Sequence, residues 1–438
     1  MAEPNAALGW SLPRRIAFRF LFSYFILFVL TGQEIGVIPF SGSLVQRYTE
    51  LWYAAAVWIG KHLLDIRYEI ALFGDGSGDT TFQWILLLCY LTLAGAATVV
   101  WSVLDRRRLE YDRLQQWFRL LLRFSLGLAL IVYGIAKVIP NQMPPPRPWT
   151  LVQRLGELAP MRLLWTFMGA SPAYQRFTGL AELLGGVLLL VPRTVLLGAL
   201  VGIADMVMVV MLNLCYDVPV KIMSFHYLVM GLLLLAPDLR RLADVFLFNR
   251  TVEPAGPPPP LFRRQWLDRV PQVLFFLLGL WVIGESFYYG HQRYQERHPP
   301  RPPFYGAWNV EKFAVDGKAV PLFTDPDRWQ CVVFQDPGKL GVERMIGSRS
   351  AYALDLDMQQ KTMKLGKFQQ DAEGRTVRDA QGNPRMDPDW HAALAFSEPG
   401  ADLLTLDGQW EGRRIHAILR RMLLTTSRFH WLIEDEEE

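Results

Sequence analysis

The chain has 438 residues, of which 51% are hydrophobic and only 20% are charged, a composition too apolar for an ordinary soluble protein of this length. Its 45 Lys and Arg nearly balance its 42 Asp and Glu, so the net charge of +3 indicates no nucleic-acid partner. Charges concentrate in residues 300–438, whereas long stretches between residues 16 and 290 carry almost none. Cys89, Cys215 and Cys331 have no CxxC spacing and indicate neither a disulfide framework nor a zinc site.

Seven segments are long and apolar enough to cross a bilayer as helices. The first follows Arg14 and Arg15 without an A-x-A cleavage site after it, so we expect an uncleaved span rather than a signal peptide. The fourth is shortened by Pro192, which predicts a tight hairpin into the fifth. Segments 44–64 and 150–168 carry charges, so we expect interfacial helices there. The predicted spans are residues 16–38, 82–103, 118–139, 176–192, 194–215, 220–237 and 271–289.

Basic residues cluster at alternate connections between these spans. Such clusters remain on the cytoplasmic side of a bacterial inner membrane. An odd number of spans therefore predicts a cytoplasmic N-terminus and a periplasmic location for residues 291–438, with loops 39–81 and 140–175 also facing out. The clusters are Arg14 and Arg15, Arg106 to Arg108, Arg193, and the six arginines Arg240, Arg241, Arg250, Arg263, Arg264 and Arg269.

Proline-rich stretches 254–260 and 299–303 precede and follow the last span, and the second is expected to be a stiff spacer. Beyond it, eight or nine short runs rich in β-branched and aromatic residues alternate with turn signals such as Asp316-Gly317 and Asp407-Gly408. They predict a closed antiparallel barrel or a sandwich. The expected divisions are a membrane domain at 1–292, a linker at 293–303, a β domain at 304–434 with a polar loop at 369–389, and a disordered acidic tail at 435–438.

Ionisable side chains inside membrane spans cost about 2.5–3.5 kcal/mol each on insertion, so they are candidate functional groups. By helical rise, those of this chain fall near the middle or in the outer half of the bilayer. This shared depth predicts one polar pocket, open to the outside, between the third and sixth spans. The alternative is that they only hold the helices together, Lys137 pairing with Glu182 and Asp205 with Lys221 or His226. The candidates are Lys137, Glu182, Asp205, Lys221 and His226, with Asn213 beside them.

If the pocket is chemical, Lys137 is the expected base, because burial makes a lysine able to accept a proton at neutral pH. His226 would move protons, and Glu182 or Asp205 would orient either group. Tyr133 precedes Lys137 by one helical turn on the same face. Together with Asn213 and Lys221, it is the expected contact for a bound cofactor.

The runs RFSLGLALIVYGIAKVIPNQMP, LLWTFMGASPAYQRFTGLAELLGGVLLLVPRTVLLGAL and NLCYDVPVKIMSFHYLVMGLLLLAPDLRRL resemble the DoxX-like membrane proteins of bacteria, over residues 118–245 and the preceding GSGDTTFQW. That group includes the small membrane subunit of thiosulfate:quinone oxidoreductases, and the resemblance implies a four-helix core. More distantly, YGIAK at 133–137 is similar to the Y-x-A-G-x-K-K segment of vitamin K-dependent γ-carboxylases, whose lysine acts as a base toward a reduced quinone. Lys137 stands at that lysine, whereas Val138 replaces the second one. The resemblance implies a quinone as the candidate cofactor.

Gly306-Ala307-Trp308 resembles the first strand of lipocalin-like barrels, in which the Trp closes one end. Arg413, Arg420 or Arg428 is expected to stack on that ring. Such a barrel either encloses a small apolar ligand or is filled and offers a docking surface. His416 and His430 are expected to be structural.

The sequence therefore predicts a bacterial inner-membrane protein that binds a lipid-soluble molecule, with a quinone as the candidate. If it is an enzyme, a quinone-linked oxidoreductase is expected. The alternative is a non-catalytic subunit or assembly factor of an envelope complex, in which the barrel and the loop GDGSGDT at 74–80 dock a protein partner.

Overall fold

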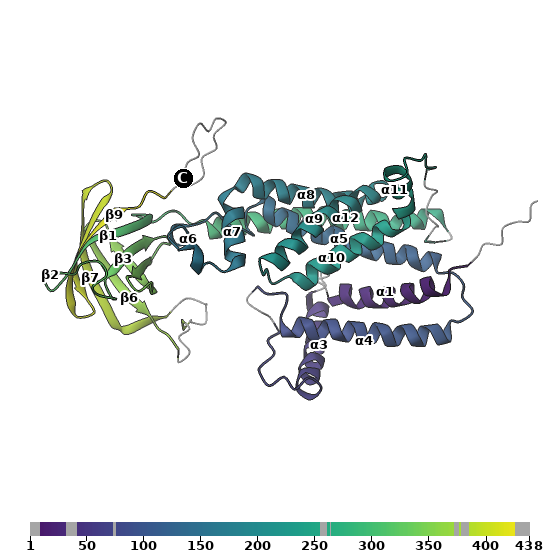
Figure 1. Ribbon diagram of the computed structural model, residues 1–438, viewed down its shortest axis with the longest axis horizontal. Helices are drawn as coiled ribbons and strands as arrows, with labels where there is room; N and C mark the ends of the chain where they lie inside the picture. Colours follow the sequence, from purple (N-terminus) through teal and green to yellow (C-terminus); the bar gives the residue numbers. More distant parts are fainter. Residues whose placement is uncertain are drawn as a thin grey trace, which may run out of the picture. The chain divides into compact units, whose positions relative to one another are not determined.

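The computed structural model describes residues 9–31, 42–72, 76–254, 261–262, 264–371, 376–377 and 385–424. The chain folds into two compact units (Figure 1). The helical unit comprises residues 1–142 and 173–292, and the barrel unit comprises residues 143–172 and 293–438. Residues 143–172, which we expected in the membrane domain, thus belong to the barrel unit.

The helical unit is built from long helices, and the sequence periodicity located most of them. Five helices of the described part are long and apolar enough to cross a membrane: α4, α5, α9, α10 with its continuation through α11, and α12. The seven predicted spans are not confirmed, because α1 and α8 are helical but are not among these five. Helix α1 contains three arginines, and the first turns of α8 are polar, with Gln175 and Arg176. The helices are α1 (Leu12–Thr31), α3 (Gly42–His62), α4 (Thr81–Leu104), α5 (Asp112–Val138), α8 (Pro172–Leu190), α9 (Val195–Cys215), α10 (Lys221–Leu235), α11 (Leu239–Phe246) and α12 (Gln265–Arg297).

Helices α5 and α8 contact each other through facing glycines. A Cβ placed on Gly134 of α5 would lie 2.7 Å from the backbone nitrogen of Leu183, and one on Gly179 of α8 would lie 2.6 Å from the backbone oxygen of Gly134. Seven residues away along each helix, a Cβ on Gly186 would lie 2.8 Å from the backbone oxygen of Gly127. Small residues allow membrane helices to pack backbone to backbone, which strengthens dispersion and polar contacts between them.

The two segments expected to be interfacial helices differ from each other. Helix α3 (Gly42–His62) covers most of segment 44–64 and exposes Leu44, Leu51 and Trp58. It runs across the direction of α4 (Figure 1). Segment 150–168 is not one helix. It is divided into α6 (Pro148–Leu151), a 3-10 turn (Leu155–Glu157) and α7 (Pro160–Ala170), because a proline starts each of the two helices.

In the described residues of the barrel unit, nine strands form one antiparallel sheet. Pairing of β1 with β9 closes eight of them into a barrel, with β2 added beside β1, which excludes the sandwich alternative. The predicted run at 429–434, most of the polar loop 369–389 and the tail 435–438 lie outside the described residues. The strands are β1 (Gly306–Val315), β2 (Lys318–Ala319), β3 (Trp329–Phe334), β4 (Lys339–Arg344), β5 (Arg349–Asp357), β6 (Thr362–Phe368), β7 (Met386–Gly400), β8 (Leu403–Trp410) and β9 (Arg413–Arg421).

The two predicted glycine turns have different outcomes. Asp316 and Gly317 adopt left-handed conformations, with φ of 49° and 78°, and connect β1 to β2 as expected. Asp407 and Gly408 do not form a turn. They lie inside β8, where a Cβ on Gly408 would fall 2.2 Å from the backbone oxygen of Ala393, so this glycine allows close approach of β7.

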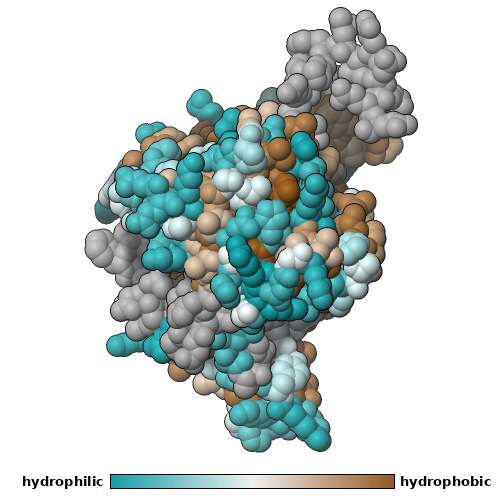
Figure 2. Space-filling view, turned by 90° about the vertical axis from the view of Figure 1, so that its left-hand side faces the viewer, coloured by the Kyte–Doolittle hydropathy of each residue, from teal (hydrophilic) through white to brown (hydrophobic). Residues whose placement is uncertain are grey.

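Aromatic side chains fill the barrel. Trp308, Trp329, Tyr352 and Trp410 are all buried, and the ring centroids of Trp329 and Trp410 are 4.5 Å apart in an edge-to-face contact. The face of the barrel unit in Figure 2 is mostly hydrophilic, with scattered apolar residues. The alternation of side chains along the strands thus places the core inside and polar groups outside.

The connection between α5 and α8 packs on the outside of the barrel. The Trp149 ring of α6 covers Gly341, whose Cβ would lie only 2.6 Å from the ring. With Val152, it also covers an apolar patch of Ala307, Cys331 and Val333 on β1 and β3. Two charged contacts fasten this segment: Arg147 to Asp336, and Arg349 to Glu157 at 2.7 Å.

We predict that Gly134→Ala destabilises the protein by about 1–3 kcal/mol, because its Cβ overlaps the α8 backbone. Gly95→Ala in α4 is the control, since nothing lies within 4 Å of its Cβ, and replacing a helical glycine stabilises by about 0.5–1 kcal/mol. Thermal unfolding of both variants in the same detergent checks this. Equal melting temperatures would contradict the backbone contact.

Burial raises the pKa of the Cys331 thiol to about 12, so at pH 8 it is protonated and inaccessible to maleimides in the folded protein. We predict that Trp149→Ala accelerates maleimide labelling of Cys331 by uncovering the patch beneath the ring. Leu155→Ala is the control, because Leu155 is 70% exposed and lies outside this patch. Unchanged labelling in Trp149→Ala would show that α6 does not cover the barrel in solution.

Candidate functional site

Lys137 and Glu182 form a buried ion pair, as the sequence led us to expect. Lys137 Nζ donates to both carboxylate oxygens of Glu182 at 2.7 Å, and the two residues are 7% and 3% exposed. The close packing at Gly179 creates this contact, since a Cβ there would lie 2.7 Å from Cβ of Lys137. Both charges are thus compensated inside the bundle.

Asp205 of α9 lies within electrostatic range of both members of this pair. Its Oδ2 is buried and has no hydrogen-bond partner among the described residues. The expected alternative pairing of Asp205 with Lys221 or His226 is wrong, because both of those side chains are engaged elsewhere. Three of the four predicted catalytic residues are therefore close together: Lys137, Glu182 and Asp205.

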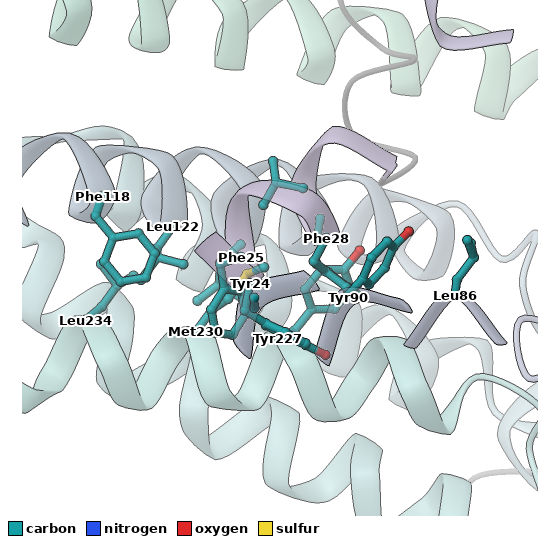
Figure 3. Close-up of a cluster of buried hydrophobic side chains, with 14 of the residues drawn as sticks. Tyr24, Phe25, Phe28, Leu86, Tyr90, Phe118, Leu122, Tyr227, Met230 and Leu234 are labelled. Carbon is teal, nitrogen blue, oxygen red and sulfur yellow. The ribbon is translucent and has the colours of Figure 1, made fainter. Parts of the chain in front are cut away.

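His226 belongs to a different group of side chains. Its Nδ1 is 2.6 Å from the Ile222 carbonyl oxygen, which can only accept, so Nδ1 carries a proton. In the neutral ring Nε2 then accepts from the Tyr24 hydroxyl, 2.5 Å away. The imidazole stacks on Phe28 with centroids 4.1 Å apart, and Tyr24, Phe28 and Tyr227 lie close together in Figure 3.

Tyr24 and His226 border an apolar cavity of about 510 Å³ between α1, α4, α9 and α10. Trp84, Leu91 and Phe225 also line it, and each is about half exposed, so the cavity opens on the side of the bundle. Lys137, Glu182 and Asp205 are not part of its lining. The prediction that all four ionisable residues share one pocket is therefore wrong: the ion pair and the histidine have different surroundings.

The three residues expected to contact a cofactor are held by other contacts. Asn213 donates to Ser224 Oγ at 2.9 Å. Lys221 Nζ is 2.8 Å from Asp217 and 3.7 Å from Asp79, although Lys221 also lines the cavity. The Tyr133 ring lies 6.5 Å from the Tyr227 ring of α10, and its hydroxyl is 4.0 Å from Sδ of Met223.

Part of the loop at 74–80 caps two helices of the bundle. Asp79 accepts from the backbone nitrogens of Lys221 and Ile222 at 2.9 and 3.0 Å and thereby caps the N-terminus of α10. Thr80 caps α4 through the backbone nitrogen of Gln83. The residues 73–75 lie outside the described residues.

Two buried arginines were missed by the sequence analysis. Arg19 donates to the Tyr111 hydroxyl and to Ser102 Oγ, and Arg123 donates to the carbonyl oxygens of Leu189 and Leu190 at the end of α8. Both lie within predicted spans, so the same criterion of ionisable residues in a span identifies them. The partner Tyr24 gave no such signal, because a tyrosine in a membrane helix is common.

The barrel tryptophan has the expected type of partner, but a different residue. Arg421 Cζ lies 4.9 Å from the centroid of the buried Trp308 ring. Sheet register explains this, since Arg421 is the residue paired with Trp308 across β1 and β9. Arg420 on the opposite face binds Glu311, Arg413 pairs with Trp410 at the far end of β9, and Arg428 lies outside the described residues.

The exposed His416 has a carboxylate partner and needs no ligand to explain it. His416 contacts Asp407 at 2.7 Å across β8 and β9, as a structural histidine would, and His430 lies outside the described residues. Within the described residues, no three His, Cys, Asp or Glu side chains come together as a metal site.

These features define a protein with a helical bundle, in which five described helices are long and apolar enough to cross a membrane, and an eight-stranded antiparallel barrel. A stretch of 138 residues, 30% of the chain, is 38% identical to the uncharacterized protein YwoB of Bacillus subtilis (strain 168) and covers 79% of that protein. The chain belongs to the same family as YwoB over this stretch. No family model and no solved structure matches it.

We predict that Lys137→Met destabilises the protein by about 3–5 kcal/mol, because the Glu182 carboxylate then stays buried without its partner. The double variant Lys137→Met with Glu182→Leu is expected to recover most of that loss, which a double-mutant cycle of thermal unfolding measures. Additive effects of the two single substitutions would show that the pair is not coupled.

Proposed function

We propose that this protein binds a lipid-soluble molecule, with a quinone as the candidate, in the cavity between α1, α4, α9 and α10. The observation that carries the proposal is an apolar cavity, open on the side of the bundle, that has a hydrogen-bonded Tyr24–His226 pair in its wall. Apolar clefts with a few placed polar groups are typical sites for small hydrophobic ligands. A molecule dissolved in the bilayer could enter from the side.

The Tyr24–His226 pair has the chemistry that such a ligand needs. The Tyr24 hydroxyl donates its hydrogen to Nε2 of His226, because Nδ1 of that ring donates to the Ile222 carbonyl. The Tyr24 oxygen keeps a lone pair that can accept a hydrogen bond from the hydroxyl of a reduced quinone. When the ligand gives its proton to the Tyr24 oxygen, Tyr24 passes its own proton to Nε2 of His226. The proposed role is therefore binding with the means for proton transfer.

The proposed setting is a bacterial inner membrane with seven spans, α1 and α8 included, a cytoplasmic N-terminus and a periplasmic barrel. A hydrogen bond supports it: Arg15 donates to the carbonyl oxygen of Arg108 at 3.0 Å, so two basic clusters lie at the same end of the bundle. Helices α5, α8, α9 and α10 correspond to the proposed DoxX-like four-helix core. The barrel is proposed to resemble lipocalins through Trp308 and Arg421.

A non-catalytic role in an envelope complex is the second candidate. The filled interior of the barrel favours it, because the buried Trp308, Trp329 and Trp410 occupy the space that a lipocalin would offer to a ligand. A filled barrel acts through its surface. Under this alternative, the protein should co-purify with a stoichiometric partner from mild detergent.

We predict that protein purified from bacterial membranes retains quinone in its lipid extract, and that Val229→Trp, which fills the cavity, lowers the retained amount severalfold. Val207→Trp is the control, because Val207 is 43% exposed on α9 and does not line the cavity. Liquid chromatography of the extracts, with melting temperatures of both variants, measures this. Equal quinone in the two variants would reject the cavity as the site.

A further inference from the structure

The barrel unit contains a large cleft of about 1340 Å³ between two proline-rich segments, 144–148 and 299–301. The end of α12 and the end of β9 complete its walls. Among the described residues that line it, there are four arginines and no aspartate or glutamate. The arginines are Arg147, Arg297, Arg301 and Arg421.

Two of these guanidinium groups are held by aromatic rings instead of carboxylates. Arg301 stacks on Tyr305 and Arg421 on Trp308, with Cζ 4.8 and 4.9 Å from the ring centroids. In the described part of the chain, neither has a carboxylate at ion-pair distance, and the buried Nε of Arg421 lacks a hydrogen-bond partner. Stacking fixes the plane of a guanidinium and leaves its N–H edges available. Arg147, by contrast, is neutralised by Asp336.

We propose that this cleft binds a phosphate-bearing anion, with Arg301 and Arg421 as the principal contacts. Guanidinium groups bind phosphate oxygens through paired, charge-assisted hydrogen bonds. Tyr294 and Tyr305 line the same cleft and are the tyrosines nearest Arg301 in the chain. The flanking prolines stiffen its walls, which reduces the entropy lost on binding.

On the proposed topology, the cleft follows directly after a membrane-crossing helix in the chain. This favours the head group of an anionic phospholipid as the source of the phosphate. Arg297 ends α12, one of the membrane-crossing candidates, and Arg301 follows after four residues, which span at most about 14 Å. Met422, Leu423 and Leu424 line the cleft as well, and Leu423 is 92% exposed. They offer apolar contact for an acyl chain next to the arginines.

The test uses the full-length protein in neutral detergent and three probes: dihexanoylphosphatidylglycerol, dihexanoylphosphatidylcholine and inorganic phosphate. We expect microscale thermophoresis to show binding of the phosphatidylglycerol, and we expect added salt to weaken this binding. Arg301→Gln with Arg421→Gln should weaken it by at least about tenfold, the loss expected for a charge-assisted hydrogen bond. Arg413→Gln with Arg414→Gln is the control, because both are exposed on β9 and outside the cleft.

Each outcome is decisive. If inorganic phosphate competes with the phosphatidylglycerol, and this competition is lost in the Arg301→Gln, Arg421→Gln variant, the site is supported and free phosphate is a sufficient ligand. If the phosphatidylglycerol binds and inorganic phosphate does not compete, a lipid head group is supported. The proposal is overturned if neither the phosphatidylglycerol nor inorganic phosphate binds, if the phosphatidylcholine binds equally well, or if the double substitution has no effect. Because Arg421 packs on Trp308, Arg301→Gln alone, in the exposed spacer, repeats the test without disturbing the barrel.

Discussion

The backbone contact between α5 and α8 is the constraint on which the helical unit depends. Because Gly134 and Gly179 have no side chains, the two helices approach until their peptide groups touch. This distance brings Lys137 within reach of Glu182 and leaves no room for water between them. It also brings Arg123 to the last carbonyl groups of α8, which helix geometry leaves without partners. Lipid offers little apolar gain for helix association, so such contacts must supply it.

The ionisable residues of the bundle divide into compensated and available groups. Lys137 and Glu182 satisfy each other, and their mutual attraction opposes reaction with a ligand. Tyr24 and His226 form a hydrogen-bonded pair beside an apolar cavity, and the Tyr24 oxygen is the group of this pair that the proposed ligand would contact. For this reason the proposed ligand site is the cavity beside α1, and not the Lys137–Glu182 pair between α5 and α8.

The local patterns predicted the elements better than their contacts. Turn chemistry at Asp316-Gly317 and the alternation of the strands indicated a barrel or a sandwich, because these signals act within a few residues. The pairing of β1 with β9, two strands that lie far apart in the sequence, decides for the barrel. Charge cost in lipid identified Lys137 and Glu182 and their pairing. Depth alone could not show which face of its helix His226 occupies, since helix rotation is set by packing with α1. Likewise the register of β9, which selects Arg421 over its neighbours, follows from closure of the whole sheet.

The attachment of residues 143–172 to the barrel changes how the two units are connected. The barrel unit is joined to the helical unit by the chain at three places: before residue 143, after residue 172 and before residue 293. A single cut before residue 293 therefore does not release a complete barrel unit. The released piece would lack Trp149 and Val152, and the patch of Ala307, Cys331 and Val333 on β1 and β3 would lose its cover.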